Sequence, residues 1–139
     1  MFKIMIILFL ITFGYGNKFE KVESVVIDNT TNLMWQDNIE VTQYSENITM
    51  SKLYCEELIL NTYTNWRLPN INELITITNI DNKRFIDKHF KYVSKVKYIS
   101  KSKYILDKDK LWYVDFSSGN LSFDNNDKIY YIRCLRNTK

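Results

Sequence analysis

The chain contains two cysteines, Cys55 and Cys134, and their pairing constrains the fold more than any other feature of the sequence. A bond between them would close a loop of about 80 residues and tie the early part of the chain to its last segment. An even number of cysteines favours a disulfide in an oxidising compartment, whereas two free thiols would suit redox or nucleophilic chemistry. The sequence has no Cys-Xaa-Xaa-Cys motif and a single histidine, His89, so we predict the disulfide.

The N-terminus predicts that the protein meets such a compartment. Residues 1–16 carry one early cation, Lys3, then an apolar run over residues 4–13, and they end in Gly-Tyr-Gly, which suits a signal peptidase. The run is shorter than the roughly 20 residues that span a bilayer, although a short uncleaved anchor is the alternative. We expect a signal peptide over residues 1–16 and a periplasmic or secreted chain with no membrane span after its removal.

Residues 17–139 are expected to form one domain. Hydrophobic residues make up 45% of the sequence, which favours a packed core over disorder, and no repeat, linker or low-complexity stretch divides this region. Clusters of β-branched and aromatic residues predict strands. These strands are expected over residues 19–28, 33–36, 111–117, 121–123 and 129–135. The strand predicted over residues 111–117 should have one face exposed to solvent.

Two helices are expected between these strands. The first has Thr49 as N-cap and a buried stripe at helical spacing that consists of Met50, Leu53, Tyr54 and Leu58. The second begins at a capping box, in which Asn70 and Glu73 satisfy each other's backbone N–H groups. Its buried face would consist of Ile71, Leu74 and Ile75. Two helices beside antiparallel strands predict an α+β fold, in which Cys134 on the last strand pins the sheet to the first helix.

Six segments share their residues and their order with a known family. Along the chain they are Asp28–Asp37 (DNTTNLMWQD), Cys55–Leu58 (CEEL), Asn65–Asn70 (NWRLPN) with Glu73-Leu74, Ile86-Asp87 with Phe90, Trp112–Phe116 (WYVDF) with Gly119, and Tyr131–Arg136 (YIRCLR). Through these segments the chain resembles the Lcl C-terminal domain family over about residues 25–136.

The resemblance implies a fold similar to that of C-type lectins, with paired terminal strands, two helices and a loop-rich second half. It also implies an exported bacterial protein, because the family occurs on such proteins. The family's namesake is an adhesin that binds sulfated glycosaminoglycans through this domain as a trimer. The chain departs from the family pattern at Tyr98-Ile99-Ser100, where Tyr-Trp-Ser-Ser is usual, and at Lys91, where a proline commonly follows the phenylalanine.

The cluster Trp66, Arg67, Pro69 and Glu73 has two interpretations. Tryptophan and arginine often anchor ligands, but Pro69 can end a strand and Arg67 can pair with Glu73 across the following turn. We favour the structural interpretation for all four residues.

Neither a metal nor another cofactor is expected. Asp124–Asp127 (DNND) offers oxygen ligands in a loop, and many lectins of the implied fold use calcium. The loop lacks the glycine and the spaced acidic residues of an EF-hand, and the Glu-Pro-Asn type motif of calcium-dependent lectins is absent. A polar turn is therefore favoured over a metal site.

Enzyme motifs are missing as well. The sequence has no Gly-Xaa-Ser-Xaa-Gly, no His-Glu-Xaa-Xaa-His and no phosphate-binding loop. Paired carboxylates could still serve a glycosidase, so an enzyme that acts on cell-wall glycans remains an alternative. We expect a protein that is not an enzyme.

Charge is distributed unevenly along the chain, and this asymmetry carries most of the functional prediction. Residues 20–57 contain eight acidic residues and two lysines, whereas residues 83–103 contain eight Lys or Arg residues and one acid, Asp87. In an extended segment, side chains two residues apart share a face and lie about 7 Å apart. Four lysines fall on such positions: Lys95, Lys97, Lys101 and Lys103.

These lysines have two interpretations of equal standing, a strip that binds a polyanion and a solvated edge strand protected from aggregation. Under the first interpretation, the chain is a binding module for an anionic glycan or surface polymer, with no nucleic-acid partner. A module that docks on another envelope protein is the second hypothesis. The sequence predicts no oligomeric state.

Overall fold

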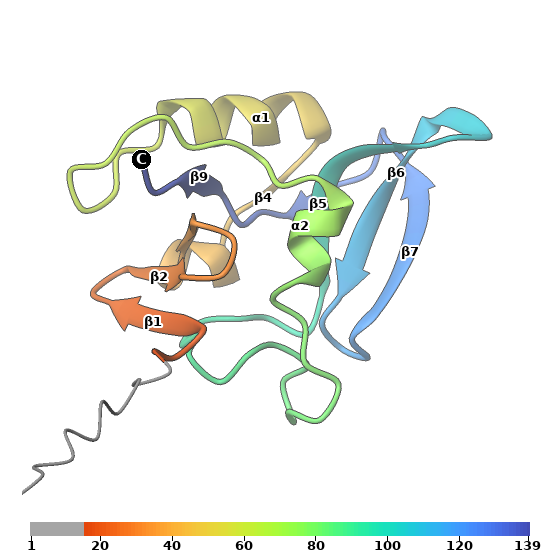
Figure 1. Ribbon diagram of the computed structural model, residues 1–139. Helices are drawn as coiled ribbons and strands as arrows, with labels where there is room; N and C mark the ends of the chain where they lie inside the picture. Colours follow the sequence, from red (N-terminus) through yellow and green to blue (C-terminus); the bar gives the residue numbers. More distant parts are fainter. Residues whose placement is uncertain (1–15) are drawn as a thin grey trace, which may run out of the picture.

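The structure is a computed structural model that describes residues 16–139 (Figure 1). The predicted signal peptide, residues 1–16, lies outside the described residues apart from Gly16. The helices are α1 (Ile48–Glu57), α2 (Ile71–Ile75) and the short 3-10 helix η1 (Ile39–Thr42). The strands are β1 (Phe19–Val22), β2 (Val25–Asp28), β3 (Leu33–Gln36), β4 (Ser45–Glu46), β5 (Lys97–Tyr104), β6 (Asp107–Asp115), β7 (Asn120–Asn125), β8 (Tyr130–Tyr131) and β9 (Leu135–Asn137).

The first sheet is antiparallel and has the strand order β1-β2-β3-β9. Strands β2 and β3 form the predicted hairpin. The single strand predicted over residues 19–28 is wrong, because the chain reverses in its middle and Val22 pairs with Val25. Glu23 allows this reversal by adopting a left-handed backbone conformation (φ 52°), which nothing in its residue type signals.

The second sheet has the order β4-β8-β5-β6-β7. Its pairings are antiparallel except that β8 runs parallel to β5, where Tyr98 faces Tyr131. The strand predicted over residues 129–135 is wrong, because this stretch divides into β8 and the start of β9, which belong to different sheets. The chain therefore crosses from one sheet to the other at residues 132–134.

Strand β6 has no wet face along its inner half, contrary to the prediction for residues 111–117. Leu111 and Tyr113 belong to one core cluster, whereas Val114 and Phe116 belong to the other. Both faces of β6 contribute to the core at these positions, because one cluster lies on each side of this part of the strand. Alternation of residue types along the strand cannot reveal what the rest of the chain places on each face.

Helix α1 begins two residues earlier than predicted. Its N-cap is Asn47, whose side chain accepts a hydrogen bond from the N–H of Met50 (3.0 Å), so the choice of Thr49 was wrong. The predicted buried stripe is also wrong in part, since Met50 and Leu53 are 41% and 40% exposed. The fully buried helix residues are Ser51 and Cys55, because the disulfide turns their face toward the core.

Helix α2 starts at the predicted capping box. The side chain of Asn70 accepts from the N–H of Glu73 (2.8 Å), and the N–H of Asn70 donates to the carboxylate of Glu73 (2.9 Å). Arg67 donates two hydrogen bonds to the same carboxylate, at 2.8 and 2.7 Å. Burial acts to raise the pKa of Glu73, but the bonds from Arg67 and Asn70 outweigh it and lower the pKa.

Trp66 and Pro69, the other two residues of the cluster that contains Arg67 and Glu73, also have structural roles. Trp66 is 2% exposed and packs in the core, and its ring N–H donates to the carbonyl of Tyr63 (3.0 Å). The carbonyl of Pro69 accepts from the N–H of Lys101 (2.9 Å), which joins the segment before α2 to strand β5.

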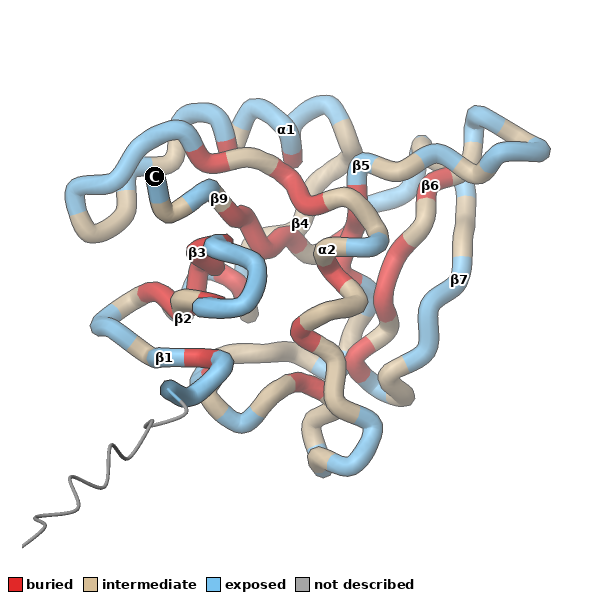
Figure 2. Tube along the Cα trace, in the orientation of Figure 1, coloured by how far each residue is buried: buried red, intermediate tan, exposed pale blue. Residues whose placement is uncertain are grey.

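Two clusters of buried side chains form the core, which is red in Figure 2. Cys55 and Cys134 are bonded to each other within the second cluster, with Cα atoms 5.6 Å apart and no exposed surface. The predicted disulfide is confirmed. It joins α1 to the crossover between the sheets, since Cys134 lies just before β9 and not on a strand.

Two helices and two mainly antiparallel sheets confirm the α+β prediction. The likeness to C-type lectins stays a prediction from the family resemblance. Within residues 16–139, no helix combines the length and the hydrophobicity that crossing a bilayer requires.

Candidate ligand-binding site

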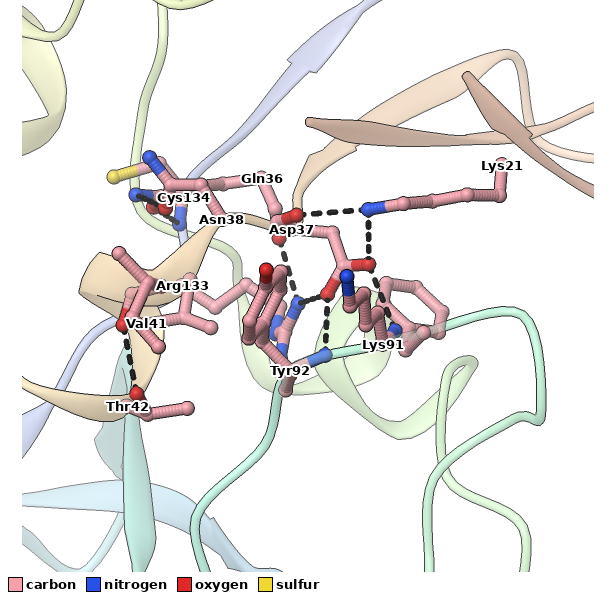
Figure 3. Close-up of polar contacts among 12 residues, drawn as sticks. Lys21, Gln36, Asp37, Asn38, Val41, Thr42, Lys91, Tyr92, Arg133 and Cys134 are labelled. Carbon is pink, nitrogen blue, oxygen red and sulfur yellow. Dashed lines mark hydrogen bonds and ion pairs between the residues drawn. The ribbon is translucent and has the colours of Figure 1, made fainter. Parts of the chain in front are cut away.

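A buried ion pair between Asp37 and Arg133 lies at the centre of Figure 3. Both side chains are fully buried, and Nη1 of Arg133 lies 3.2 Å from Oδ1 of Asp37. Lys21 reaches the other carboxylate oxygen from β1, at 2.5 Å. Because Asp37 follows β3 and Arg133 precedes β9, the pair fastens the first sheet to the crossover between the sheets.

The same carboxylate holds the beginning of the lysine-rich segment. The backbone N–H groups of Lys91 and Tyr92 donate to Asp37 at 2.8 and 3.1 Å, and the carbonyl of Tyr92 accepts from Arg133. Residues 91–96 form neither helix nor strand. Their course is therefore set by these bonds to buried charges and not by a strand ladder.

The hydroxyl of Tyr98 holds the other end of residues 91–96. It accepts from the N–H of Ser94 (3.0 Å) and donates to the carbonyl of Val41. Burial raises the pKa of Tyr98, so the hydroxyl keeps its proton and remains a donor. The carbonyl of Val96 accepts from the N–H of Phe116 (3.0 Å), which leaves Lys95 between two anchored residues.

A surface cavity of about 370 Å³ opens beside the start of β5. Segments distant in the sequence meet there: the start of β5, the end of β6 and the residues around β8. Its lining comprises two lysines, one aspartate, one serine, one tyrosine and two aliphatic residues. These are Lys95, Lys97, Asp115, Ser117, Tyr131, Val96 and Ile129.

Charge in this region is partly compensated. The ammonium group of Lys97 lies 4.8 Å from the centroid of the Tyr113 ring and 3.8 Å from a carboxylate oxygen of Asp124. A hydrogen bond from Lys128 and one from the backbone N–H of Asn125 lower the pKa of Asp124, so its negative charge is retained. Lys97 remains 45% exposed, and Lys95 is exposed as well.

The structure places the four predicted lysines in two pairs. Lys95 precedes β5 and lines the cavity with Lys97. Regular alternation holds only to Ile99, because the register with β6 then shifts before Lys103, which pairs with Leu111. Lys101 and Lys103 therefore lie beyond an irregularity of the strand. The four lysines do not form one evenly spaced line along a flat strand.

The side chains of two serines take part in this irregularity. The hydroxyl of Ser100 donates to the carbonyl of Trp112 (2.7 Å), and the N–H of Ser102 donates to the Ser100 oxygen (3.2 Å). The N–H of Lys101 pairs with Pro69 and not with β6. Side-chain hydrogen bonds here replace part of the ladder between β5 and β6.

The predicted polar turn at Asp124–Asp127 spans the end of β7 and the residues before β8. Asp124 binds the ammonium group of Lys128 at 2.8 Å, which occupies the carboxylate with an internal cation. Within the described part of the chain, no group of three or more His, Cys, Asp or Glu side chains is arranged to hold a metal ion.

The sequence reasoning missed the three other polar residues of the cavity, Asp115, Ser117 and Tyr131. The hydroxyl of Ser117 donates to Asp115 at 2.6 Å, so this pair adds oxygen acceptors to the cavity that the lysines line. Tyr131 reaches the cavity because β8 pairs with β5 in parallel, a long-range contact. The Tyr131–Arg136 segment was recognised as a family signature, but no signal in it indicated a cavity.

Comparison with known families gives one assignment. The sequence model of the Lcl C-terminal domain matches residues 24–136. The chain belongs to the Lcl C-terminal domain family. Among curated proteins, none matches the sequence.

The two departures from the family pattern fall at interpretable positions of this Lcl C-terminal domain. Ile99 is 1% exposed and packs in the second core cluster. Lys91 donates its N–H to Asp37, a bond that a proline at this position would lack. The second departure therefore adds one hydrogen bond to the buried network that positions the lysine segment.

Proposed function

We propose that this Lcl C-terminal domain is a non-enzymatic module that binds an anionic glycan or another anionic surface polymer, and that it works in the periplasm or outside the cell. The observation that carries the proposal is that Lys95 and Lys97 line one surface cavity together with the acceptors of Asp115 and Ser117. Cations suit the sulfate or carboxylate groups of such a polymer, whereas carboxylate and hydroxyl oxygens suit sugar hydroxyls.

The cavity is held in place before any ligand arrives. The buried network around Asp37 and the hydroxyl of Tyr98 anchor the residues on either side of Lys95, and Lys97 is the first residue of β5. A site built on anchored backbone loses less conformational entropy on binding than a mobile loop does. Lysine adds tolerance for an irregular polymer, because its compact charge sits on a flexible stem.

Replacing Lys95 and Lys97 with glutamine should weaken binding to a sulfated polymer. Each exposed charge contact contributes about 0.2 to 1 kcal/mol, so the double variant should bind about 2- to 30-fold more weakly. The measurement is the salt concentration at which the protein elutes from immobilised heparin, together with the dissociation constant for soluble heparin. The melting temperature should stay within about 2 °C of the original value, because exposed positions contribute little to stability.

The matched control changes Lys52 and Lys83 to glutamine, which removes the same charge from exposed positions outside the cavity. Equal losses in both double variants would mean that net charge alone drives retention, and the cavity would lose its role. A third variant, Lys101→Gln with Lys103→Gln, tests whether the polymer continues along β5. This variant should lose less heparin affinity than the Lys95 and Lys97 variant, since Lys101 and Lys103 lie beyond the strand irregularity.

A second candidate function, docking on another envelope protein, is favoured by a different surface. A groove of about 300 Å³ runs along α1, where Tyr44 and Tyr54 stack with ring centroids 4.4 Å apart. Met50 and Leu53 line it with a large exposed fraction. Binding there would depend on apolar contact and would persist at high salt, which distinguishes it from polymer binding at the cavity.

Export itself leads to a separate prediction. If residues 1–16 are a signal peptide, protein recovered from the cell envelope should begin at Asn17, because the Gly-Tyr-Gly end suits cleavage after Gly16. Mass spectrometry of the intact protein measures this directly. Recovery of a chain that still begins at Met1 would contradict cleavage.

A further inference from the structure

The β5–β6 hairpin carries two aliphatic residues at its tip. Tyr104 pairs with Asp107, so Ile105 and Leu106 form a two-residue loop. Loop tips of this kind usually carry Asn, Asp, Ser or Gly, which meet water well. Neither Ile105 nor Leu106 has a positive φ, so the backbone of this turn does not itself require glycine or asparagine. Ile105 and Leu106 are 86% and 80% exposed, more than any other large hydrophobic side chain among the described residues. Two neighbouring aliphatic side chains that are this exposed gain nothing from packing within the domain, which points to a contact with something outside it.

A rigid support presents this tip. The rings of Tyr104 and Phe123 stack with centroids 3.9 Å apart, and Trp112 contacts both edge-on, at 5.7 and 5.2 Å. The three rings come from β5, β7 and β6, so they join all three strands below the loop. The hairpin projects from the body of the domain at the upper right of Figure 1, and most of its end is exposed in Figure 2.

The charges around the tip are mainly positive. Residues 101–110 contain four lysines and two aspartates, a net charge of +2. One aspartate, Asp107, lies 3.9 Å from the ammonium group of Lys110 and is partly compensated by it. Lys103 and Lys108 are exposed on either side of the loop.

We propose that the Ile105-Leu106 tip inserts into the surface of an anionic lipid bilayer. The two aliphatic side chains enter the boundary between headgroups and acyl chains, and the flanking lysines bind lipid phosphates while their stems cover apolar surface. A convex aliphatic tip ringed by lysines suits a lipid surface better than a protein pocket, because protein hot spots are rich in Trp, Tyr and Arg and poor in Leu. The inference goes beyond the polymer-binding proposal, since Ile105 and Leu106 lie outside the cavity.

The test uses co-sedimentation with vesicles of phosphatidylglycerol and, separately, of phosphatidylcholine. The protein should bind the anionic vesicles and leave the zwitterionic ones largely unbound, because the lysines need lipid phosphates without a compensating charge. Changing Ile105→Ser and Leu106→Asn should lower the partition coefficient at least about tenfold, since the apolar contact is lost. Lys103→Gln with Lys108→Gln should lower it only at low salt.

The matched control replaces two other exposed aliphatic residues, Ile59→Ser and Ile80→Asn, which are 70% and 74% exposed, and it should bind the vesicles unchanged. The tip variant keeps every lysine, so its retention on heparin should also be unchanged, and the two proposals can fail separately. Absence of binding to anionic vesicles, or equal binding by the tip variant, would overturn the proposal. Concentration-dependent oligomers without lipid that disappear in the tip variant would overturn it too, and would identify a second copy as the occupant of the tip.

Discussion

Replacing Asp37 with alanine should lower the free energy of unfolding by about 3 to 5 kcal/mol, the usual cost of removing one partner of a buried ion pair. Arg133 would remain fully buried without its carboxylate, and the N–H groups of Lys91 and Tyr92 would lose their acceptor. The free energy of unfolding of native proteins is about 5 to 15 kcal/mol, so this loss is a large part of the total stability. Equilibrium unfolding in urea measures it.

Two comparisons separate the buried pair from charge removal in general. Asp107→Ala breaks the exposed contact to Lys110, so its cost should be under about 1 kcal/mol. Combining Asp37→Ala with Arg133→Met should cost less than the sum of the two single changes, because the second change removes the stranded cation. Additive losses would show that the two side chains do not depend on each other.

The Asp37 variant also tests the link between the buried network and the candidate site. Amide hydrogen exchange at Lys91 and Tyr92 should become faster, since their N–H groups donate to Asp37. Because the anchored residues lead to Lys95, retention on heparin should fall as well, although no cavity side chain has changed. Unchanged exchange at both amides would refute the anchoring role.

Removal of the disulfide is the second large effect that we expect. The sequence separation of Cys55 and Cys134 is 79 residues, and the chain-entropy model assigns about 4 to 5 kcal/mol to a loop of this size. The double variant Cys55→Ala with Cys134→Ala should therefore melt more than about 10 °C below the original protein. Both positions are fully buried, and alanine avoids adding two hydroxyls to the core.

A reducing agent supplies the control for this experiment. Dithiothreitol should lower the melting temperature of the original protein to about that of the double variant, because it opens the same loop, and should leave the variant unchanged. If the double variant has the same melting temperature as the original protein, core packing alone holds α1 against the crossover between the sheets.

Several features of this domain follow from the sequence because their causes are local. The capping box of Asn70 and Glu73 spans three positions, and the pairing of Arg67 with Glu73 spans six, so residue identity and spacing suffice to predict them. The hairpin of β2 and β3 follows from two hydrophobic runs with turn residues between them. The disulfide was predictable for a different reason, since only two cysteines were available to pair.

Tertiary structure decided the features that depend on what a segment meets. Met50 and Leu53 fit a buried helix stripe by spacing, yet they are exposed because the disulfide turns another face of α1 inward. The spacing of Lys95, Lys97, Lys101 and Lys103 predicts one even line, but hydrogen bonds from Ser100 to β6 and from Lys101 to Pro69 shift the register of β5.

The candidate site itself belongs to this second group. Asp37 and Arg133 lie 96 residues apart, and neither residue type predicts a fully buried charge, which becomes stable only when the partner and the backbone donors arrive together. The cavity likewise needs β5, β6 and β8 side by side before Lys95, Lys97, Asp115 and Tyr131 can line one surface. Local patterns determine which elements form, whereas burial and long-range pairing, which act only in the folded chain, determine which side chains meet.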